Sequence, residues 1–120
     1  MGHILIVDDD WMNRELLEAY LTMGGYTVKL ANSGETALEM IEAEQPDLIM
    51  LDIRMTGISG FEVCMQIKSS EHTKTIPVLM VSALESEGDR MQASQMGADG
   101  FVAKPFNSAS ILEQIKTHLG

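Results

Sequence analysis

Five polar side chains that could handle a charged group follow apolar segments of strand length in this 120-residue sequence: Asp8, Asp9, Asp52, Ser82 and Lys104. Three carboxylates that lie close together need a counter-charge. Mg²⁺ prefers such oxygen ligands and often shares its coordination with phosphate. A carboxylate beside Mg²⁺, a lysine and a hydroxyl has the parts to accept a phosphoryl group, as in aspartyl-phosphate chemistry.

Each of these side chains has a predicted role in that chemistry. Asp52 is the predicted nucleophile and, with Asp9, a ligand of Mg²⁺, while Asp8 is expected to support the ion through water. Lys104 and Ser82 are expected to hold the phosphoryl oxygens, the lysine by its charge and the serine by donating its hydroxyl proton. A simpler interpretation stays open, because residues 8–10 could merely cap a helix and Asp52 could simply end a strand.

The five side chains converge only if the apolar segments are parallel strands of one sheet. The sequence alternates strand-like and helix-like segments five times, and this alternation gives a parallel sheet with helices on both faces. Residues 48–51 are apolar without alternation, which is typical of a strand buried on both faces. Residues 26–30 alternate, which indicates a strand at the edge. The predicted fold is therefore α/β, a single (βα)5 domain over residues 1–120 with the flavodoxin-like strand order 2-1-3-4-5.

The boundaries of the elements follow from apolar periodicity and from capping residues. We predict strands over residues 3–7, 26–30, 48–52, 76–81 and 100–103. We predict helices over residues 10–23, 33–43, 59–69, 86–96 and 107–119. The fourth helix is poor in large apolar residues, so Met91, Ala93 and Met96 are expected to anchor it, and we expect it to be the loosest element. In the predicted order, strands one, three, four and five are neighbours about 4.8 Å apart, so that their ends line one cleft.

Composition narrows the class of protein and its partners. The chain is 45% hydrophobic and 22% charged, as is usual for a globular domain. Eight Lys and Arg against eighteen Asp and Glu give a formal net charge of −10, which disfavours direct binding to nucleic acid. No apolar run is long enough to span a membrane, there is no room for a signal peptide before the first strand, and the lone Cys64 cannot form an internal disulfide. We therefore expect a cytoplasmic protein without a membrane or nucleic-acid partner.

The sequence resembles the CheY-like receiver domains of response regulators in two-component signal transduction. The resemblance covers the whole chain, and five motifs carry it: Val7–Asp10, Leu51–Met55 with Gly60, Val81–Ala83, Gly97–Phe101 and Lys104–Phe106. Each motif is weak alone, but five of them in this order and at these intervals are specific.

The resemblance implies a phosphorelay receiver that takes a phosphoryl group onto Asp52 from the phosphohistidine of a sensor kinase or phosphotransfer protein. It implies that the backbone carbonyl of Arg54 is the third protein ligand of Mg²⁺ and that the Lys104–Pro105 peptide is cis. Phe101 matches an aromatic switch position that moves together with Ser82. Such a domain catalyses only its own phosphotransfer and autodephosphorylation. Its fourth helix, fifth strand and fifth helix would signal to an effector or partner domain, and they could pair two phosphorylated copies.

Two positions depart from the commonest pattern of the family, and two other functions stay open. Thr56 replaces a usual proline, which leaves the loop freer in the unfolded chain, and Ser82 replaces the commoner threonine but keeps the hydroxyl. A phosphatase of the haloacid-dehalogenase type would use Asp8 as nucleophile, but the Gly-Thr that normally follows is missing. A receiver that docks without being phosphorylated is the other alternative. The residue to which phosphate attaches distinguishes these functions.

Overall fold

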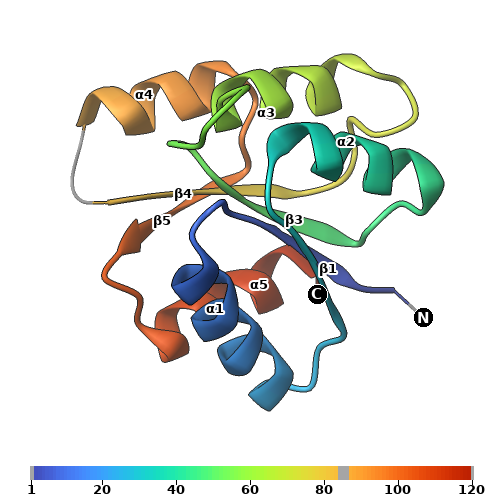
Figure 1. The fold of residues 1–120 in the computed structure, drawn as a ribbon. Helices are drawn as coiled ribbons and strands as arrows, with labels where there is room; N and C mark the ends of the chain where they lie inside the picture. The colour runs from blue at the N-terminus through green and yellow to red at the C-terminus, as the bar shows by residue number, and fades with distance from the viewer. Residues whose placement is uncertain (1, 84–86, 120) are drawn as a thin grey trace.

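The computed structural model, shown in Figure 1, describes residues 2–83 and 87–119. Its elements in chain order are β1 (Ile4–Val7), α1 (Trp11–Met23), β2 (Val28–Ala31), α2 (Gly34–Ala43), β3 (Leu48–Asp52), α3 (Gly60–Ser69), β4 (Val78–Ala83), α4 (Glu87–Gln95), β5 (Gly100–Lys104) and α5 (Ser108–Leu119). The five strands form one parallel sheet in the order β2-β1-β3-β4-β5. The predicted fold class and strand order are therefore confirmed.

Helices cover both faces of the sheet, with α1 and α5 on one face and α2, α3 and α4 on the other (Figure 1). One core cluster joins the strands to Leu17 of α1 and Ile115 of α5. The second joins them to Ile41 of α2, Ile67 of α3 and Ala93 of α4. Strands β1 and β3 are buried along their whole length, as the unbroken apolar runs predict. No helix among the described residues is both long and apolar enough to cross a lipid bilayer.

Strands β2 and β4 each begin two residues later than the sequence pattern predicts, because nearby turns use the first backbone donors. The amide of Tyr26 donates to the carbonyl of Leu21 at the end of α1, 3.0 Å away, and β2 begins two residues later. The amide of Ile76 donates to Thr73 in the preceding turn, and Pro77 has no N–H to donate. Strand β4 therefore begins at residue 78 and extends past its predicted end, so that Ser82 lies within the strand.

Helix α4 packs differently from the prediction. Its predicted start at residue 86 lies outside the described residues. Ala93 is buried and Met96 packs against the core as expected, but Met91 is 62% exposed, so its predicted anchoring role is wrong. Asp89 is buried instead, with only 7% of its surface exposed. Residues four apart share a face of a helix, so the face that presents Asp89 and Ala93 to the protein turns Met91 outward.

Lys68 of α3 ties together the segments that lead into β4 and β5. Its Nζ donates to the carbonyls of Lys74 and Ile76, 3.1 and 2.7 Å away, and to Oδ2 of Asp99, 2.7 Å away. The same oxygen of Asp99 accepts from the amide of Val78 at 2.8 Å. An ammonium group has three protons, and each is matched here by an acceptor. This contact fixes the starts of two strands whose other ends reach the predicted site.

Helix α3 begins directly against the end of β3, and Gly60 makes this approach possible. Its amide donates to the carbonyl of Ile53, 3.0 Å away. A Cβ atom at residue 60 would lie 2.2 Å from the carbonyl oxygen of Asp52 and 2.9 Å from the Cα of Ile53. These are backbone atoms of the strand end, so they cannot move aside as a flexible side chain would. Gly60 therefore helps to place Asp52.

We expect Gly60→Ala to lower the free energy of unfolding by about 3 kcal/mol, because the added methyl overlaps the backbone at Asp52. Urea unfolding followed by circular dichroism measures the change. Gly25→Ala is the matched control: Gly25 has a φ of 91°, but a Cβ there would meet nothing within 4 Å, so only about 1 kcal/mol of backbone strain is expected. Equal losses of stability in the two variants would show that overlap with the backbone at Asp52 adds nothing to the cost of Gly60→Ala.

Candidate functional site

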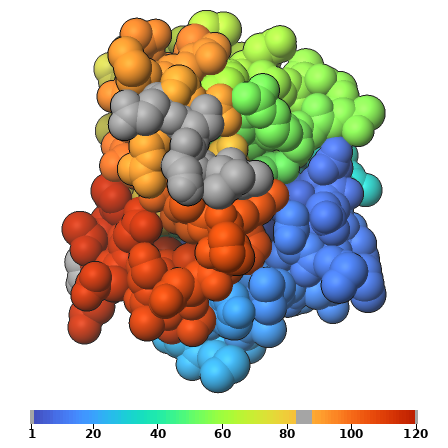
Figure 2. Space-filling view, turned by 90° about the vertical axis from the view of Figure 1, so that its left-hand side faces the viewer, coloured from blue at the N-terminus to red at the C-terminus, as the bar shows by residue number. Residues whose placement is uncertain are grey.

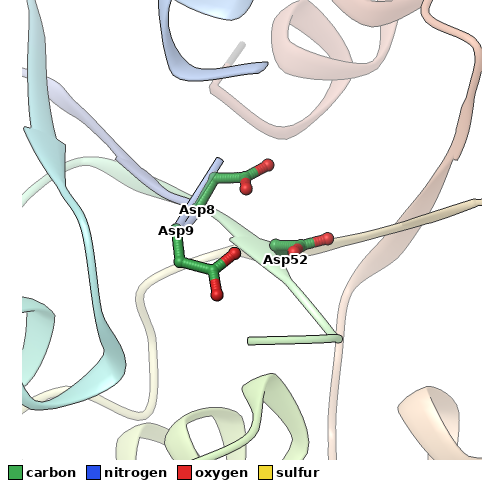
Figure 3. A group of neighbouring side chains, drawn as sticks. All are labelled: Asp8, Asp9 and Asp52. Atoms are coloured by element: carbon green, nitrogen blue, oxygen red, sulfur yellow. The ribbon is translucent and has the colours of Figure 1, made fainter. Parts of the chain in front are cut away.

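Three carboxylates lie together at the edge of the sheet where the strands end. Asp8 and Asp9 follow β1, Asp52 ends the neighbouring β3, and each offers an oxygen atom within 4.8 Å of the others. Asp8 and Asp52 are only 1% and 4% exposed, whereas Asp9 is exposed. Figure 3 shows the three carboxyl groups turned toward a common space. The structure therefore brings together all three predicted acidic residues.

Lys104 reaches this acidic cluster from the end of β5. Its Nζ donates to Oδ1 of Asp52 at 3.2 Å and lies 3.8 Å from Oδ2 of Asp8. The peptide that joins Lys104 to Pro105 is cis, which is the conformation that the resemblance implies. One ammonium thus faces three carboxylates, and two negative charges remain when all three acids are ionised.

Burial and mutual repulsion shift the protonation of the two inner acids. Burial, and after it the charge of Asp8, raise the pKa of Asp52 to about 6, although the nearby Lys104 lowers it. Burial also raises the pKa of Asp8, against the hydrogen bond that its Oδ1 accepts from the amide of Asp10 at 2.9 Å. The cluster is therefore short of positive charge.

One oxygen of the cluster lacks a hydrogen-bond donor. Within residues 2–83 and 87–119, Oδ2 of Asp8 is buried and accepts no hydrogen bond. Mg²⁺ binds oxygen at 2.0–2.1 Å, so two ligands on opposite sides of the ion lie about 4.2 Å apart, and the three acids already bring oxygens within 4.8 Å of one another. Asp10 plays another part, because its Oδ1 caps α1 by accepting from the amides of Met12 and Asn13. The remaining acids fit a small divalent cation by charge, chemistry and spacing.

Ser82 lies beside this cluster but is engaged with α4. Its hydroxyl, which is buried, donates to Oδ2 of Asp89 at 3.1 Å. The guanidinium of Arg54 donates to the other oxygen of Asp89 at 2.8 Å. The sequence prediction missed Asp89, because an acid on a helix with few apolar residues gives no periodic signal that it faces inward.

Thr56 is a second residue whose contact the sequence did not reveal. Its backbone N–H and its hydroxyl both donate to Oδ2 of Asp9, at 2.9 and 3.1 Å. A proline, which is usual at this position in the family that the chain resembles, could supply neither donor. In the folded protein the loop after β3 is therefore attached to one of the predicted metal ligands.

Phe101 lies on β5 away from the carboxylates. Its ring packs against the core cluster that includes α4, and the guanidinium carbon of Arg90 is 4.7 Å from the ring centroid. Ser82 thus contacts Asp89, and Phe101 contacts Arg90. The two predicted switch residues therefore contact consecutive residues of α4. Their roles as a switch stay predictions, as does that of the Arg54 carbonyl.

Figure 2 looks onto the edge where these groups gather. The start of α1 in blue, the segment after β3 in green and the segment after β5 in orange-red come together on this face. A surface pocket is lined by Asp9, which follows β1, and by residues of the β3–α3 loop, among them Arg54, Thr56 and Ser59. The acidic cluster is therefore next to an opening on the molecular surface.

A five-stranded parallel (βα)5 sheet with acids, a hydroxyl and a lysine at its carboxyl edge is typical of signal receiver domains. Residues 4–116 match the family described as "Response regulator receiver domain". The chain is 41% identical over 116 residues to response regulator PleD of Caulobacter vibrioides, covering 97% of this chain and 26% of PleD. It is 40% identical to response regulator MprA of Mycobacterium ulcerans, covering 97% of this chain and 49% of MprA.

Solved structures give the same result. A putative response regulator from Chloroflexus aurantiacus superposes with a TM-score of 0.96 at 36% identity, over 98% of this chain and 97% of that one. Chemotaxis response regulator CheY4 of Vibrio cholerae superposes with a TM-score of 0.92 at 29% identity, over 99% of both chains. The chain belongs to the response regulator receiver domain family. It spans half or less of the length of the curated relatives named here.

The raised pKa of Asp52 predicts how stability depends on pH without divalent cations. The folded protein keeps this proton up to about pH 6, whereas the unfolded chain loses it near 3.8. The contribution of Asp52 to stability therefore falls as the pH rises from about 4 to 6. We expect Asp52→Asn to raise the free energy of unfolding at pH 7.5 by about 3 kcal/mol, on the scale of 1.4 kcal/mol per pKa unit.

Urea unfolding in EDTA at pH 4.0 and 7.5 measures this difference, which should nearly disappear at the lower pH. Asp47→Asn is the control, because Asp47 is an exposed aspartate outside the cluster. If Asp52→Asn is no more stable than the original protein at pH 7.5, the conclusion that the cluster is short of positive charge is wrong.

Proposed function

We propose that this receiver domain accepts a phosphoryl group on Asp52 from a phosphohistidine, with Mg²⁺ bound at the acidic cluster. The observation that carries the proposal is the buried carboxylate of Asp52, which lies 3.2 Å from the ammonium of Lys104 and within 4.8 Å of oxygens of Asp8 and Asp9. The match of residues 4–116 to the response regulator receiver domain family supports the same assignment.

In the proposed transfer, a carboxylate oxygen of Asp52 attacks the phosphorus of the donor. An O–P bond forms as the P–N bond to the imidazole breaks, and the imidazole leaves with the electron pair and takes up a proton. Lys104 is placed to neutralise charge on the phosphoryl oxygens, and Ser82 can donate to one of them. Attack of water on phosphorus in the same site would break the O–P bond to Asp52, release inorganic phosphate and return Asp52 to its carboxylate.

The acidic cluster would hold the ion through Asp9, Asp52 and the backbone carbonyl of Arg54, with Asp8 acting through water. Bound there, Mg²⁺ supplies positive charge to the phosphoryl oxygens. Its two charges equal the excess that three carboxylates leave over Lys104. The buried Oδ2 of Asp8, which accepts no hydrogen bond from the described part of the chain, gives further support.

The wider function follows from the family. We propose that a sensor histidine kinase or phosphotransfer protein supplies the phosphoryl group, and that α4, β5 and α5 pass the signal to an effector or partner domain. Pairing of two phosphorylated copies through this surface belongs to the same proposal, as do a cytoplasmic location and an independent domain over residues 1–120. The domain would catalyse only its own phosphotransfer and dephosphorylation.

Incubation with acetyl phosphate and Mg²⁺ tests the acceptor. We expect the intact protein to gain the mass of one phosphoryl group and Asp52→Asn to gain none, because the nucleophile is then absent. Intact-mass spectrometry measures both, and Asp47→Asn should be modified like the original protein. A gain that persists in Asp52→Asn but is lost in Asp8→Asn would favour a phosphatase of the haloacid-dehalogenase type. No gain in any variant would favour a receiver that docks without phosphorylation.

Magnesium binding has its own optical probe, because Trp11 is the only tryptophan and lies two residues from Asp9. We expect Mg²⁺ to change the emission of Trp11 and to raise the free energy of unfolding by about 2.7 kcal/mol at a hundred times its Kd. Asp9→Asn should weaken both effects, and EDTA should reverse them. Stabilisation that is equally strong in Asp9→Asn would remove Asp9 from the metal site.

A further inference from the structure

Helix α4 reaches the phosphoryl-acceptor edge through a buried acid. One carboxylate oxygen of Asp89 accepts from the Ser82 hydroxyl at 3.1 Å, and the other accepts from the Arg54 guanidinium at 2.8 Å. Asp89 is only 7% exposed, so its charge depends on polar partners of this kind. It therefore connects α4 to β4, the strand next to β3, and to the loop that follows Asp52.

The Ser82 hydroxyl has two competing acceptors once a phosphoryl group is present. A serine hydroxyl carries a single proton, and in this structure that proton is directed to Asp89. The proposed function needs the same proton for an oxygen of the group on Asp52. Donation to one acceptor therefore ends donation to the other. The Asp89 carboxylate and the phosphoryl group on Asp52 are both anionic, so they also repel each other.

We propose that Asp89 is a positioning residue that holds Ser82 and α4 in the resting arrangement and loses Ser82 when Asp52 is phosphorylated. This inference rests on the proposed function of Asp52. Asp89 then opposes phosphorylation, because the new hydrogen bond forms only at the expense of the existing one. The next residue, Arg90, lies over the ring of Phe101, so release of Asp89 loosens the helix turn that also contacts the second switch residue.

The phosphoryl analogue BeF₃⁻ tests this competition by isothermal titration calorimetry with Mg²⁺. We expect Asp89→Ala to bind BeF₃⁻ roughly tenfold more tightly than the original protein, the order expected for one hydrogen bond to a charged group. In the Ser82→Ala background the same substitution should change the affinity by about twofold at most, because the contested proton is gone. An equal gain in both backgrounds would overturn the proposal, since the effect would then come from Arg54 or from local unfolding.

Asp89→Asn covers the case in which Asp89→Ala does not fold. An asparagine oxygen can still accept from Ser82 but without the charge, so we expect a smaller tightening that again requires Ser82. Binding no tighter than that of the original protein would overturn the proposal. Gln95→Ala, an exposed change on the same helix, should leave the affinity unchanged.

A second readout follows the helix itself. Amide hydrogen exchange in residues 88–96 should be faster in Asp89→Ala without BeF₃⁻ and should rise in the original protein when BeF₃⁻ is added. If exchange is unchanged in both cases, the claim that Asp89 holds α4 in its resting arrangement is wrong. The same titrations separate the two proposals. Absence of BeF₃⁻ binding to the original protein refutes the acceptor site, whereas normal binding that the Asp89 substitutions leave unchanged refutes only the competition.

Discussion

Two carboxylates buried beside one ammonium form the constraint on which the site depends. Asp8 and Asp52 are almost inaccessible, and Lys104 contacts both. Removing charges from water costs several kcal/mol each unless partners replace the solvent, so such a cluster needs a rigid frame. The fully buried strands β1 and β3 supply it, because their apolar faces fix the strand ends from which these acids project. The raised pKa of Asp52 shows that compensation by Lys104 is incomplete.

Much of the fold, and most of the residues that form the site, could be predicted from the sequence. Continuous apolar runs indicate buried parallel strands, and parallel strands place their ends at one edge, so Asp52 and Lys104 could be expected to meet although 52 positions separate them. This inference needs only the order of the strands, which is indicated by the alternation of apolar and polar residues over residues 26–30, typical of an edge strand. The distances within the cluster, and hence the strength of its charge imbalance, depend on side-chain packing that a pattern does not contain.

The contacts that the sequence did not reveal depend on the orientation of loops and of one helix. Periodicity assigns the inner face of α4 by apolar residues and therefore predicts Met91 inside, whereas the structure buries Asp89. A site that offers a hydroxyl and a guanidinium can reverse the usual preference, because it satisfies the buried acid. The contact of Thr56 with Asp9 was missed for a related reason: its amide and hydroxyl donate to Asp9 only in one loop conformation.

On the proposed function, the change in charge at Asp52 is too small to carry the signal by long-range electrostatics alone. A phosphoryl group bears up to two negative charges but replaces a carboxylate that already bears one, so the site gains about one charge. The field of one charge at the surface is screened within about 8 Å at physiological ionic strength. A hydroxyl proton is instead directional and can be given to only one acceptor at a time. The hydrogen bond between Ser82 and Asp89 is therefore the contact through which phosphorylation would most directly reach α4.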